Sequence, residues 1–237
     1  CNLRVWNGYF SKVTKNTHKR DTICPCSVCG NLKTEPFMKV GQYQYLTCVK
    51  CEAKLLAPAH WLSRGDEYKH YLTHENDADD PNYQKFVSKL MDAVLPKLNP
   101  KATGLDYGCG PSSALAKLLI QKGFDVKLYD PFFESNEYSL SLKYDFITCS
   151  ETAEHFHRPA EEFRTLNSLL KPGGWLGIMT KFQTDNNRFA NWNYRRDPSH
   201  VVFYRKRTFN VIAKQMDWTC QFPYKDIVLM QKKLEII

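Results

Sequence analysis

A glycine-containing turn between an apolar segment and a helix-like segment constrains the fold of this chain more than any other feature. Gly108 and Gly110 stand in the run Leu105-Asp106-Tyr107-Gly108-Cys109-Gly110-Pro111, and the helix-like residues 112–122 follow. Glycine allows backbone conformations that are closed to larger residues and a close approach to a ligand. The next helix directs the positive end of its dipole at that ligand. The sequence therefore predicts a strand, a turn and a helix with a binding site at the turn.

This turn departs in two places from the pattern that binds dinucleotides. Ser113 stands where a third glycine is expected, and Asp106 lies two residues before the first glycine. A carboxylate at that point would repel a pyrophosphate. It suits a cofactor that carries positive charge near the turn.

Three more segments follow in an informative order. Residues 125–130 are typical of a short strand that ends in Asp130, about twenty residues after the glycines, where a carboxylate can hold ribose hydroxyls. Residues 144–151 predict a third strand that leads into Ala153-Glu154-His155-Phe156. Residues 169–179 predict a helix end, a proline–glycine turn and a fourth buried strand.

Together, these four segments resemble the class I S-adenosylmethionine-dependent methyltransferases, over roughly the last 140 residues. The resemblance implies a doubly wound, Rossmann-like α/β domain at residues 100–237. It implies S-adenosylmethionine as the methyl donor and S-adenosylhomocysteine as the product. The sulfonium and ammonium groups of this cofactor suit the acid at Asp106. Residues expected to bind it are Asp106, Gly108, Gly110, Asp130, Pro131, Phe132, Ser150 and Glu151.

The connection after Asp130 departs from that family. Only fourteen residues separate Asp130 from Asp145, too few for the helix and strand that many methyltransferases have there. Either the sheet lacks a strand or the connection is unusual. The usual adenine contact is therefore in doubt, and Pro131, Phe132 and Phe133 are the expected substitutes.

Two Cys-x-x-Cys pairs predict a zinc ribbon at residues 23–58. Cys26 and Cys29 are separated by eighteen residues from Cys48 and Cys51, a spacing typical of four-cysteine zinc sites. Four cysteine ligands leave no open position, so this zinc is expected to be structural. Unrelated buried thiols and a redox pair are the alternatives. Cys24 is a spare ligand or a bystander.

The rest of the amino-terminal part carries weaker signals. Residues 1–22 form a basic arm, which we interpret as a solvated extension. Residues 59–99 form a helical linker, and Asp79-Asp80-Pro81 predicts the start of its helix. The polar cluster from His70 to Asp77 is either a solvated loop or a lid over the cofactor and acceptor.

Composition limits the location and the partners. Nine cysteines cannot all pair internally, which favours a reducing cytoplasm. Cys109, Cys149 and Cys220 are expected to be small buried hydrophobic residues. No stretch of about 18 apolar residues is present to span a membrane. The formal net charge of +8 favours an anionic partner.

Candidate catalytic groups follow the third and fourth strands. The stretch from Ser150-Glu151 to Glu154-His155 resembles the ubiquinone-pathway O-methyltransferases, and His200 resembles a histidine before the last helix of small-molecule methyltransferases. His155 and His200 are the predicted bases that take a proton from the acceptor. Residues 189–204 interleave aromatic residues with Arg195 and Arg196, which indicates either an acceptor pocket or a packed loop.

Three functions fit these features. The first is methylation of an oxygen, nitrogen or carbon atom of a small molecule, expected to be anionic or aromatic. The second is methylation of tRNA or rRNA, with the zinc ribbon docking the nucleic acid, because the layout resembles the zinc-bearing ribosomal RNA guanine methyltransferases. The third is a cofactor-binding regulator without enzymatic activity.

Overall fold

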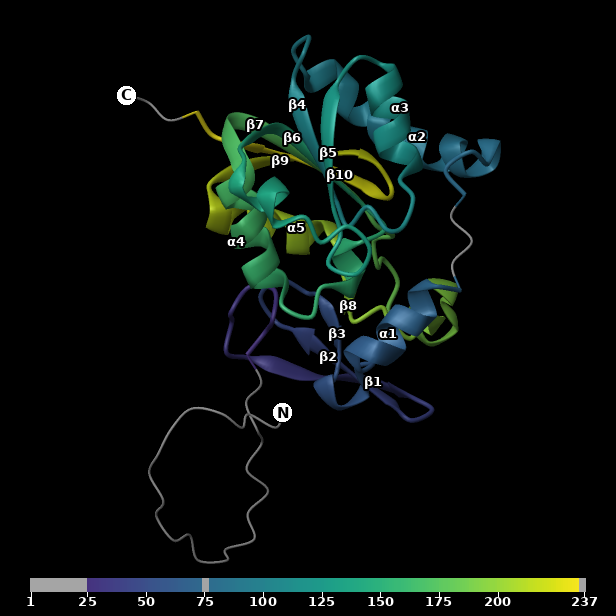
Figure 1. Ribbon diagram of the computed structural model, residues 1–237. Helices are drawn as coiled ribbons and strands as arrows, with labels where there is room; N and C mark the ends of the chain where they lie inside the picture. The colour runs from purple at the N-terminus through teal and green to yellow at the C-terminus, as the bar shows by residue number, and fades with distance from the viewer. Residues whose placement is uncertain (1–24, 74–76, 235–237) are drawn as a thin grey trace, which may run out of the picture.

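The computed structural model describes residues 25–73 and 77–234. The predicted arm at residues 1–22, together with Cys24 and His74, lies outside the described residues. Two β-sheets organise the rest (Figure 1). The main sheet has the strand order β5-β4-β6-β7-β10-β9. Its strands are β4 (Thr103–Tyr107), β5 (Asp125–Tyr129), β6 (Tyr144–Ser150), β7 (Leu170–Met179), β9 (Trp218–Tyr224) and β10 (Ile227–Lys232).

The four predicted strands form the parallel part of the main sheet. β4 pairs with β5 and β6, and β6 pairs with β7, all in parallel, whereas β10 is antiparallel to β7 and β9. β5 is an edge strand, and the connection to β6 contains only the short 3₁₀ helix η3 (Glu137–Ser141). In the described part of the chain the sheet therefore has no strand beyond β5, which was one of the two expected alternatives.

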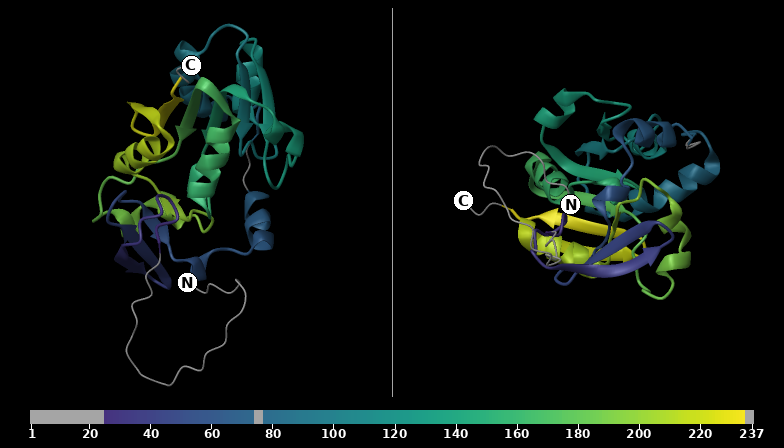
Figure 2. Two further views of the ribbon diagram at one scale, coloured as in Figure 1. Left: turned by 90° about the vertical axis from the view of Figure 1, so that its left-hand side faces the viewer. Right: turned by 90° about the horizontal axis from the view of Figure 1, so that it is seen from below.

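Helices cover both faces of this sheet. α2 (Pro81–Val94) and α3 (Ala114–Gln121) share a core with one face through side chains such as Leu90 and Leu119. α4 (Pro159–Leu169) and α5 (Lys206–Met216) pack on the other face through Phe163 and Phe209. Figure 2 shows these layers from two further sides. The expectation of a doubly wound α/β domain is confirmed.

Local side-chain caps explain where the helices begin. The Asp80 carboxylate accepts a hydrogen bond from the backbone N–H of Asn82, and Pro81 occupies the first turn of α2 as predicted. Ser63 caps α1 (Arg64–Tyr71) in the same way. His70 and Tyr71 thus belong to a helix, so the interpretation of the polar cluster as a solvated loop is wrong up to Tyr71. Apolar contacts of α1 with the aromatic residues of the 131–133 loop favour the helix there.

The predicted proline–glycine turn before the fourth strand is also corrected. β7 begins at Leu170, and Pro172 and Gly173 lie inside it. The register with β6 shifts between Tyr144 and Phe146, which pair with Leu170 and Trp175, so the extra residues form a bulge. Gly173 has a φ of 79°, which glycine tolerates in such a bulge.

A second, four-stranded sheet lies at the carboxyl ends of the parallel strands (Figure 1). It consists of β1 (Thr34–Val40), β2 (Tyr43–Cys48), β3 (Lys54–Leu56) and β8 (Val202–Phe203). β8 follows His200 in the sequence and pairs with β3 through Lys54↔Phe203 and Leu55↔Val202. The cysteine-bearing segment and the segment before α5 therefore share one sheet and one core.

Among the described residues, no helix is long and apolar enough to cross a lipid bilayer.

Candidate cofactor and acceptor site

A cavity of about 890 Å³ lies at the carboxyl ends of β4, β5 and β6. Ligands of open parallel sheets bind at this edge. The cavity is enclosed by the turn after β4, the loop after β5, the loop after β6, helix α1 and residues 193–200. All ten residues predicted to hold the cofactor or to act as bases line it, namely Asp106, Gly108, Gly110, Asp130, Pro131, Phe132, Ser150, Glu151, His155 and His200.

The two glycines of the turn are required for different reasons. Gly108 has a φ of 77°, and a Cβ atom there would lie 2.1 Å from Cγ2 of Thr152. Gly110 has a φ of 64°, but a Cβ atom there would meet no heavy atom within 4 Å. Gly108 therefore allows the turn to pack against the loop after β6, whereas Gly110 leaves open space beside the cavity.

Asp106 is buried beneath this turn with both carboxylate oxygens hydrogen-bonded. Ser113 Oγ donates to Oδ2 at 2.6 Å and Thr148 Oγ1 donates to Oδ1 at 2.7 Å. Burial raises the pKa of Asp106, and these two hydrogen bonds oppose the rise. A cation in the cavity would stabilise the charged form of this carboxylate.

Asp130 connects the glycine turn to the loop after β5. Its Oδ2 accepts a hydrogen bond from the Gly110 N–H at 3.0 Å, and its Oδ1 accepts from the N–H groups of Phe132 and Phe133 at 2.8 and 3.1 Å. The carboxylate thus lies where the turn and the expected adenine-binding loop meet. Its role in holding ribose stays a prediction.

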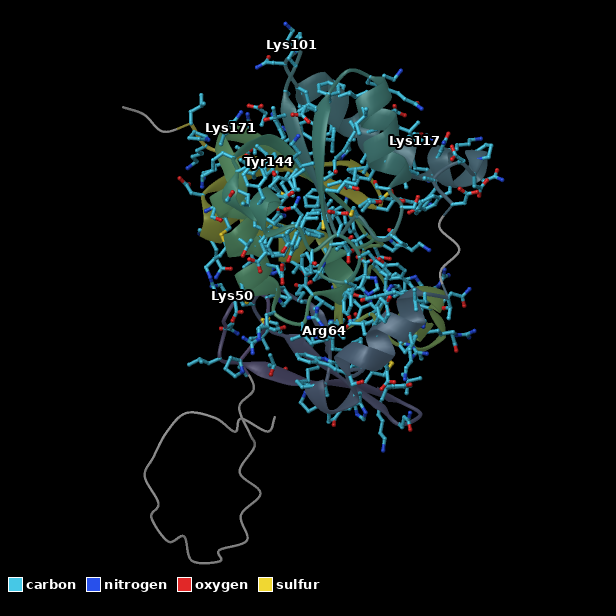
Figure 3. All side chains as sticks on the ribbon, in the orientation of Figure 1. Lys50, Arg64, Lys101, Lys117, Tyr144 and Lys171 are labelled. Atoms are coloured by element: carbon cyan, nitrogen blue, oxygen red, sulfur yellow. The ribbon has the colours of Figure 1, made fainter. Side chains whose placement is uncertain are left out.

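Helix α1 covers this loop. The Arg64 guanidinium donates to the Pro131 carbonyl at 3.0 Å and lies 4.9 Å from the ring centroid of Phe132. Tyr68 stacks on the same ring at 6.2 Å. Figure 3 labels Arg64 where α1 meets the body of the molecule. The lid alternative for the cluster from His70 to Asp77 stays a prediction. Sequence reasoning missed Arg64 and Tyr68, because no motif distinguishes them from other residues of a short polar helix.

Glu154, His155 and His200 meet at the far end of the site. Metal-binding atoms of the three side chains all lie within 4.8 Å of one another. The centroids of the two imidazole rings are 4.7 Å apart, and the angle between the ring planes is 72°. Glu154 lies in the short 3₁₀ helix η4 (Ala153–His155), whereas His200 comes from the segment before β8. The structure therefore brings together the two histidines predicted as bases with Glu154, which the sequence placed beside His155 after the third strand but did not assign as a base.

The Glu154 carboxylate is fully buried. Its Oε1 accepts a short hydrogen bond from the Tyr194 hydroxyl, and its Oε2 has no hydrogen-bond partner in the described part of the chain. Burial raises the pKa of Glu154, and the neighbouring His200 lowers it in part. A buried carboxylate oxygen without a partner is costly and therefore needs an explanation.

Glu151 has an unusual backbone conformation beside this cluster. Its φ of 48° is rare for a residue other than glycine, and such strain concentrates at functional sites. Burial and the nearby charge of Glu154 raise the pKa of Glu151 to about 9. The raised pKa favours the protonated form of this carboxyl group, which can donate a hydrogen bond.

The aromatic and arginine side chains of residues 189–204 mostly form core rather than pocket. Phe189, Phe203 and Tyr204 are buried, and Arg195 donates to the Tyr45 hydroxyl at 3.1 Å. Neither Arg195 nor Arg196 lines the cavity. The packed-loop alternative therefore holds for the buried aromatic residues and for Arg195, whereas Arg196 is exposed. Asn193, Tyr194, Asp197 and His200 are the members of this stretch that reach the cavity.

The ionisable lining of the cavity is mainly acidic. The carboxyl groups are Glu67, Asp106, Asp130, Glu151, Glu161, Glu162 and Asp197, and the permanently cationic groups are Arg64, Arg158 and Lys181. The net positive charge of the chain therefore resides elsewhere. Figure 3 labels Lys50, Lys101, Lys117 and Lys171 on different sides of the molecule.

The four predicted zinc ligands converge at the base of the small sheet. Cys26 Sγ lies 3.7 Å from Cys51 Sγ, and Cys29 Sγ lies 3.6 Å from Cys48 Sγ. All four thiols are buried and within 4.8 Å of one another. A zinc–sulfur distance of about 2.3 Å in a tetrahedron requires sulfur atoms about 3.8 Å apart, so the group fits this metal. The hydrogen bond with Cys51 lowers the pKa of Cys26 to about 6.

Helix α5, which packs on the main sheet, also hydrogen-bonds to this cysteine group. Thr208 Oγ1 donates to the Cys51 carbonyl and Gln215 Nε2 donates to the Cys29 carbonyl, both at 2.9 Å. The helix thus contacts one residue of each Cys-x-x-Cys pair. The cysteine group and α5 are therefore joined by direct hydrogen bonds.

Comparison with known proteins agrees with this architecture. Residues 80–221 match the family model described as a methyltransferase domain. The chain therefore belongs to the methyltransferase domain family.

Individual relatives cover part of the chain. The ubiquinone biosynthesis O-methyltransferase of Serratia proteamaculans is 32% identical over 92 residues, which are 39% of this chain and 36% of the relative. The enzyme of the same name from Aeromonas salmonicida is 30% identical over 91 residues, which are 38% of each chain. The match thus spans little more than a third of these relatives. A solved S-adenosylmethionine-dependent methyltransferase from Archaeoglobus fulgidus is 18% identical, with a TM-score of 0.49 over 63% of this chain and 94% of that chain.

Proposed function

We propose that this chain transfers a methyl group from S-adenosylmethionine to a small-molecule acceptor in the cavity at the carboxyl ends of β4, β5 and β6. The observation that carries the proposal is the convergence of the glycine turn, two buried carboxylates and the Glu154–His155–His200 group on one cavity of about 890 Å³. The volume of this cavity is near the upper end of the usual range for ligand sites, so it suits a cofactor and an acceptor bound together.

The cofactor would lie along the turn after β4. Asp106 would offset its positive charge, and the open space at Gly110 would admit it close to the backbone. Asp130 would exchange its backbone hydrogen bonds for ribose hydroxyls. Pro131 and Phe132 would contact the adenine under α1, and Ser150 and Glu151 would complete the wall.

The acceptor would lie between this cofactor and the two histidines. Methyl transfer is a displacement in which the protein aligns acceptor and donor and, where needed, removes a proton. An imidazole of His155 or His200 can accept that proton directly. The names of the matched relatives favour an oxygen atom as the methylated site, while the acidic lining argues against an anionic acceptor.

A structural zinc on Cys26, Cys29, Cys48 and Cys51 is part of the proposal. The distances between the four sulfur atoms support this proposal, and so does the hydrogen bond that connects Cys51 to α5. The zinc would hold β1–β3 and β8 beneath the cavity. Every described cysteine is free, which supports a reducing compartment such as the cytoplasm. The mainly acidic lining of the cavity disfavours the RNA alternative, because the RNA backbone is anionic.

Calorimetric titration with S-adenosylmethionine tests the donor half of this function. Asp130→Ala should weaken binding at least tenfold, because it removes the carboxylate between the turn and the 131–133 loop. Asp125→Ala, an exposed acid at the other end of β5, is the matched control. If Asp130→Ala and wild type bind S-adenosylmethionine with equal affinity, Asp130 does not hold the cofactor. Labelled methyl transfer in a cell extract then identifies the acceptor, and label found only in RNA would overturn the small-molecule proposal.

A further inference from the structure

The main sheet ends at β5, and the carboxyl end of this strand is where the proposed function places the nucleoside half of the cofactor. The connection from β5 to β6 contains only the short helix η3, so no further strand of the described chain borders β5. Asp130 and the 131–133 loop follow β5 directly. Ligand sites bury most of the surface of their ligand, so a site at this open edge needs a wall from another part of the chain. Helix α1 provides such a wall.

Arg64, the first residue of α1, contacts the 131–133 loop in two ways (Figure 3). Its Nη2 donates a hydrogen bond to the carbonyl of Pro131 at 3.0 Å, across 67 residues of sequence. Its guanidinium also lies over the ring of Phe132, 4.9 Å from the ring centroid. All three residues line the cavity. A planar guanidinium can make both contacts at once, whereas a lysine ammonium lacks the flat surface.

Tyr68 lies one turn further along α1 and extends this contact. Its ring stacks on Phe132 with the centroids 6.2 Å apart and an angle of 18° between the ring planes. The same ring lies 5.6 Å from the ring of Phe133. Helix α1 therefore holds the loop through one backbone carbonyl and two aromatic side chains.

Asp130 is the second support of the loop. Its Oδ1 accepts hydrogen bonds from the N–H groups of Phe132 and Phe133. In the proposed function this carboxylate exchanges those bonds for ribose hydroxyls, so the loop loses this support when the cofactor binds. The contacts of Arg64 involve a carbonyl and a ring, and they are independent of Asp130. In the loaded protein the loop then depends on α1.

We propose that Arg64 is a positioning residue for the nucleoside half of the donor, and that it holds the 131–133 loop in place when the cofactor occupies Asp130. This inference rests on the proposed function. A loop that α1 has already ordered loses less conformational freedom on binding, which increases affinity. Arg64 acts through Pro131 and Phe132 and needs no contact of its own with the cofactor.

Calorimetric titration of the full-length chain with S-adenosylhomocysteine and with adenosine tests this role. Both probes carry the nucleoside half, and neither carries a net charge. Arg64→Ala should weaken the binding of both about tenfold, because one hydrogen bond and one cation–π contact are lost. Lys69→Ala is the matched control, since Lys69 is an exposed cation of the same helix that pairs with Asp66 and does not line the cavity. This control should bind both probes as wild type does.

Two further variants separate positioning from charge. Arg64→Lys keeps the charge without the flat guanidinium and should lose nearly as much affinity as Arg64→Ala. Phe132→Ala removes the ring on which Arg64 lies. If Arg64 acts through the loop, its replacement by alanine should weaken binding less than threefold in the Phe132→Ala background, compared with about tenfold in wild type.

Each outcome decides a different point. Wild-type affinity of Arg64→Ala overturns the inference and leaves the proposed donor site intact. Full affinity of Arg64→Lys shows that charge alone is required and overturns it too, as does a tenfold loss that persists in the Phe132→Ala background. Circular dichroism identifies a variant that fails to fold, and the remaining variants then decide. A wild-type chain that binds neither probe contradicts the proposed function itself, and the inference falls with it.

Discussion

Ser113 supports Asp106 and helix α3 with one hydroxyl group. Its Oγ accepts a hydrogen bond from the backbone N–H of Ala116 at 2.9 Å and donates to Oδ2 of Asp106 at 2.6 Å. The serine that interrupts the dinucleotide pattern is thus the N-cap of the helix and orients the acid of the turn. Ser113 and Asp106, the two residues that depart from that pattern, are therefore joined by one hydrogen bond.

Replacement of this serine should affect stability and cofactor affinity together. Ser113→Ala should lower the free energy of unfolding by about 1 kcal/mol through loss of the cap. It should also weaken S-adenosylmethionine binding, because Asp106 loses an orienting donor. Ser113→Thr keeps the hydroxyl and is the control. Denaturant unfolding and calorimetry measure the two effects, and a destabilised Ser113→Ala variant with unchanged affinity would contradict the orienting role.

The two glycines of the turn should respond differently to alanine. Gly108→Ala combines an unfavourable positive φ with a Cβ atom 2.1 Å from Thr152, so we expect a loss of more than about 2 kcal/mol in unfolding free energy. Gly110→Ala carries only the backbone cost, about 1 kcal/mol. Urea titration of both variants measures the difference. Equal losses of unfolding free energy in the two variants would show that the loop after β6 moves at Thr152 and makes room for the Cβ atom.

Removal of metal from the four cysteines should disturb more than the small sheet. Elemental analysis should find zinc at this group, and Cys48→Ser should lose it. Metal binding of this kind contributes directly to folding. Since Thr208 and Gln215 of α5 bond to Cys51 and Cys29, the variant should also unfold at a lower temperature. Cys220→Ser, a cysteine outside the group, is the control. A zinc-free protein with unchanged melting temperature would contradict this expectation.

Asp145 should contribute to acid sensitivity. Burial alone would raise its pKa, but hydrogen bonds from Thr103 and Lys171 outweigh it and hold the pKa below 3.8. Its contribution to stability is therefore complete above about pH 4 and disappears as the pH falls through the lower folded value. Unfolding experiments between pH 5 and pH 3 should show a smaller loss for Asp145→Asn than for wild type. Parallel losses would exclude Asp145 as a source of the pH dependence.

Local signals determined much of the fold. The strands at β4, β5, β6 and β7, the cap at Asp80 and the cysteine spacing are each encoded within a few neighbouring residues. Periodicity, turn chemistry and ligand spacing act over that range. The sequence could not reveal that Pro172 and Gly173 lie within a bulge, because that depends on pairing with β6.

The sequence by itself determined one end of the cavity: an acid and two glycines at the end of β4 and a second acid after β5 follow two adjacent parallel strands, whose carboxyl ends meet. Only the tertiary structure decided the other end. Pairing of β8 with β3 and packing of the 189–204 segment bring His200 to Glu154 and His155, and direct Arg195 toward Tyr45 instead. Those contacts depend on how distant segments bury their apolar faces, which no local pattern specifies.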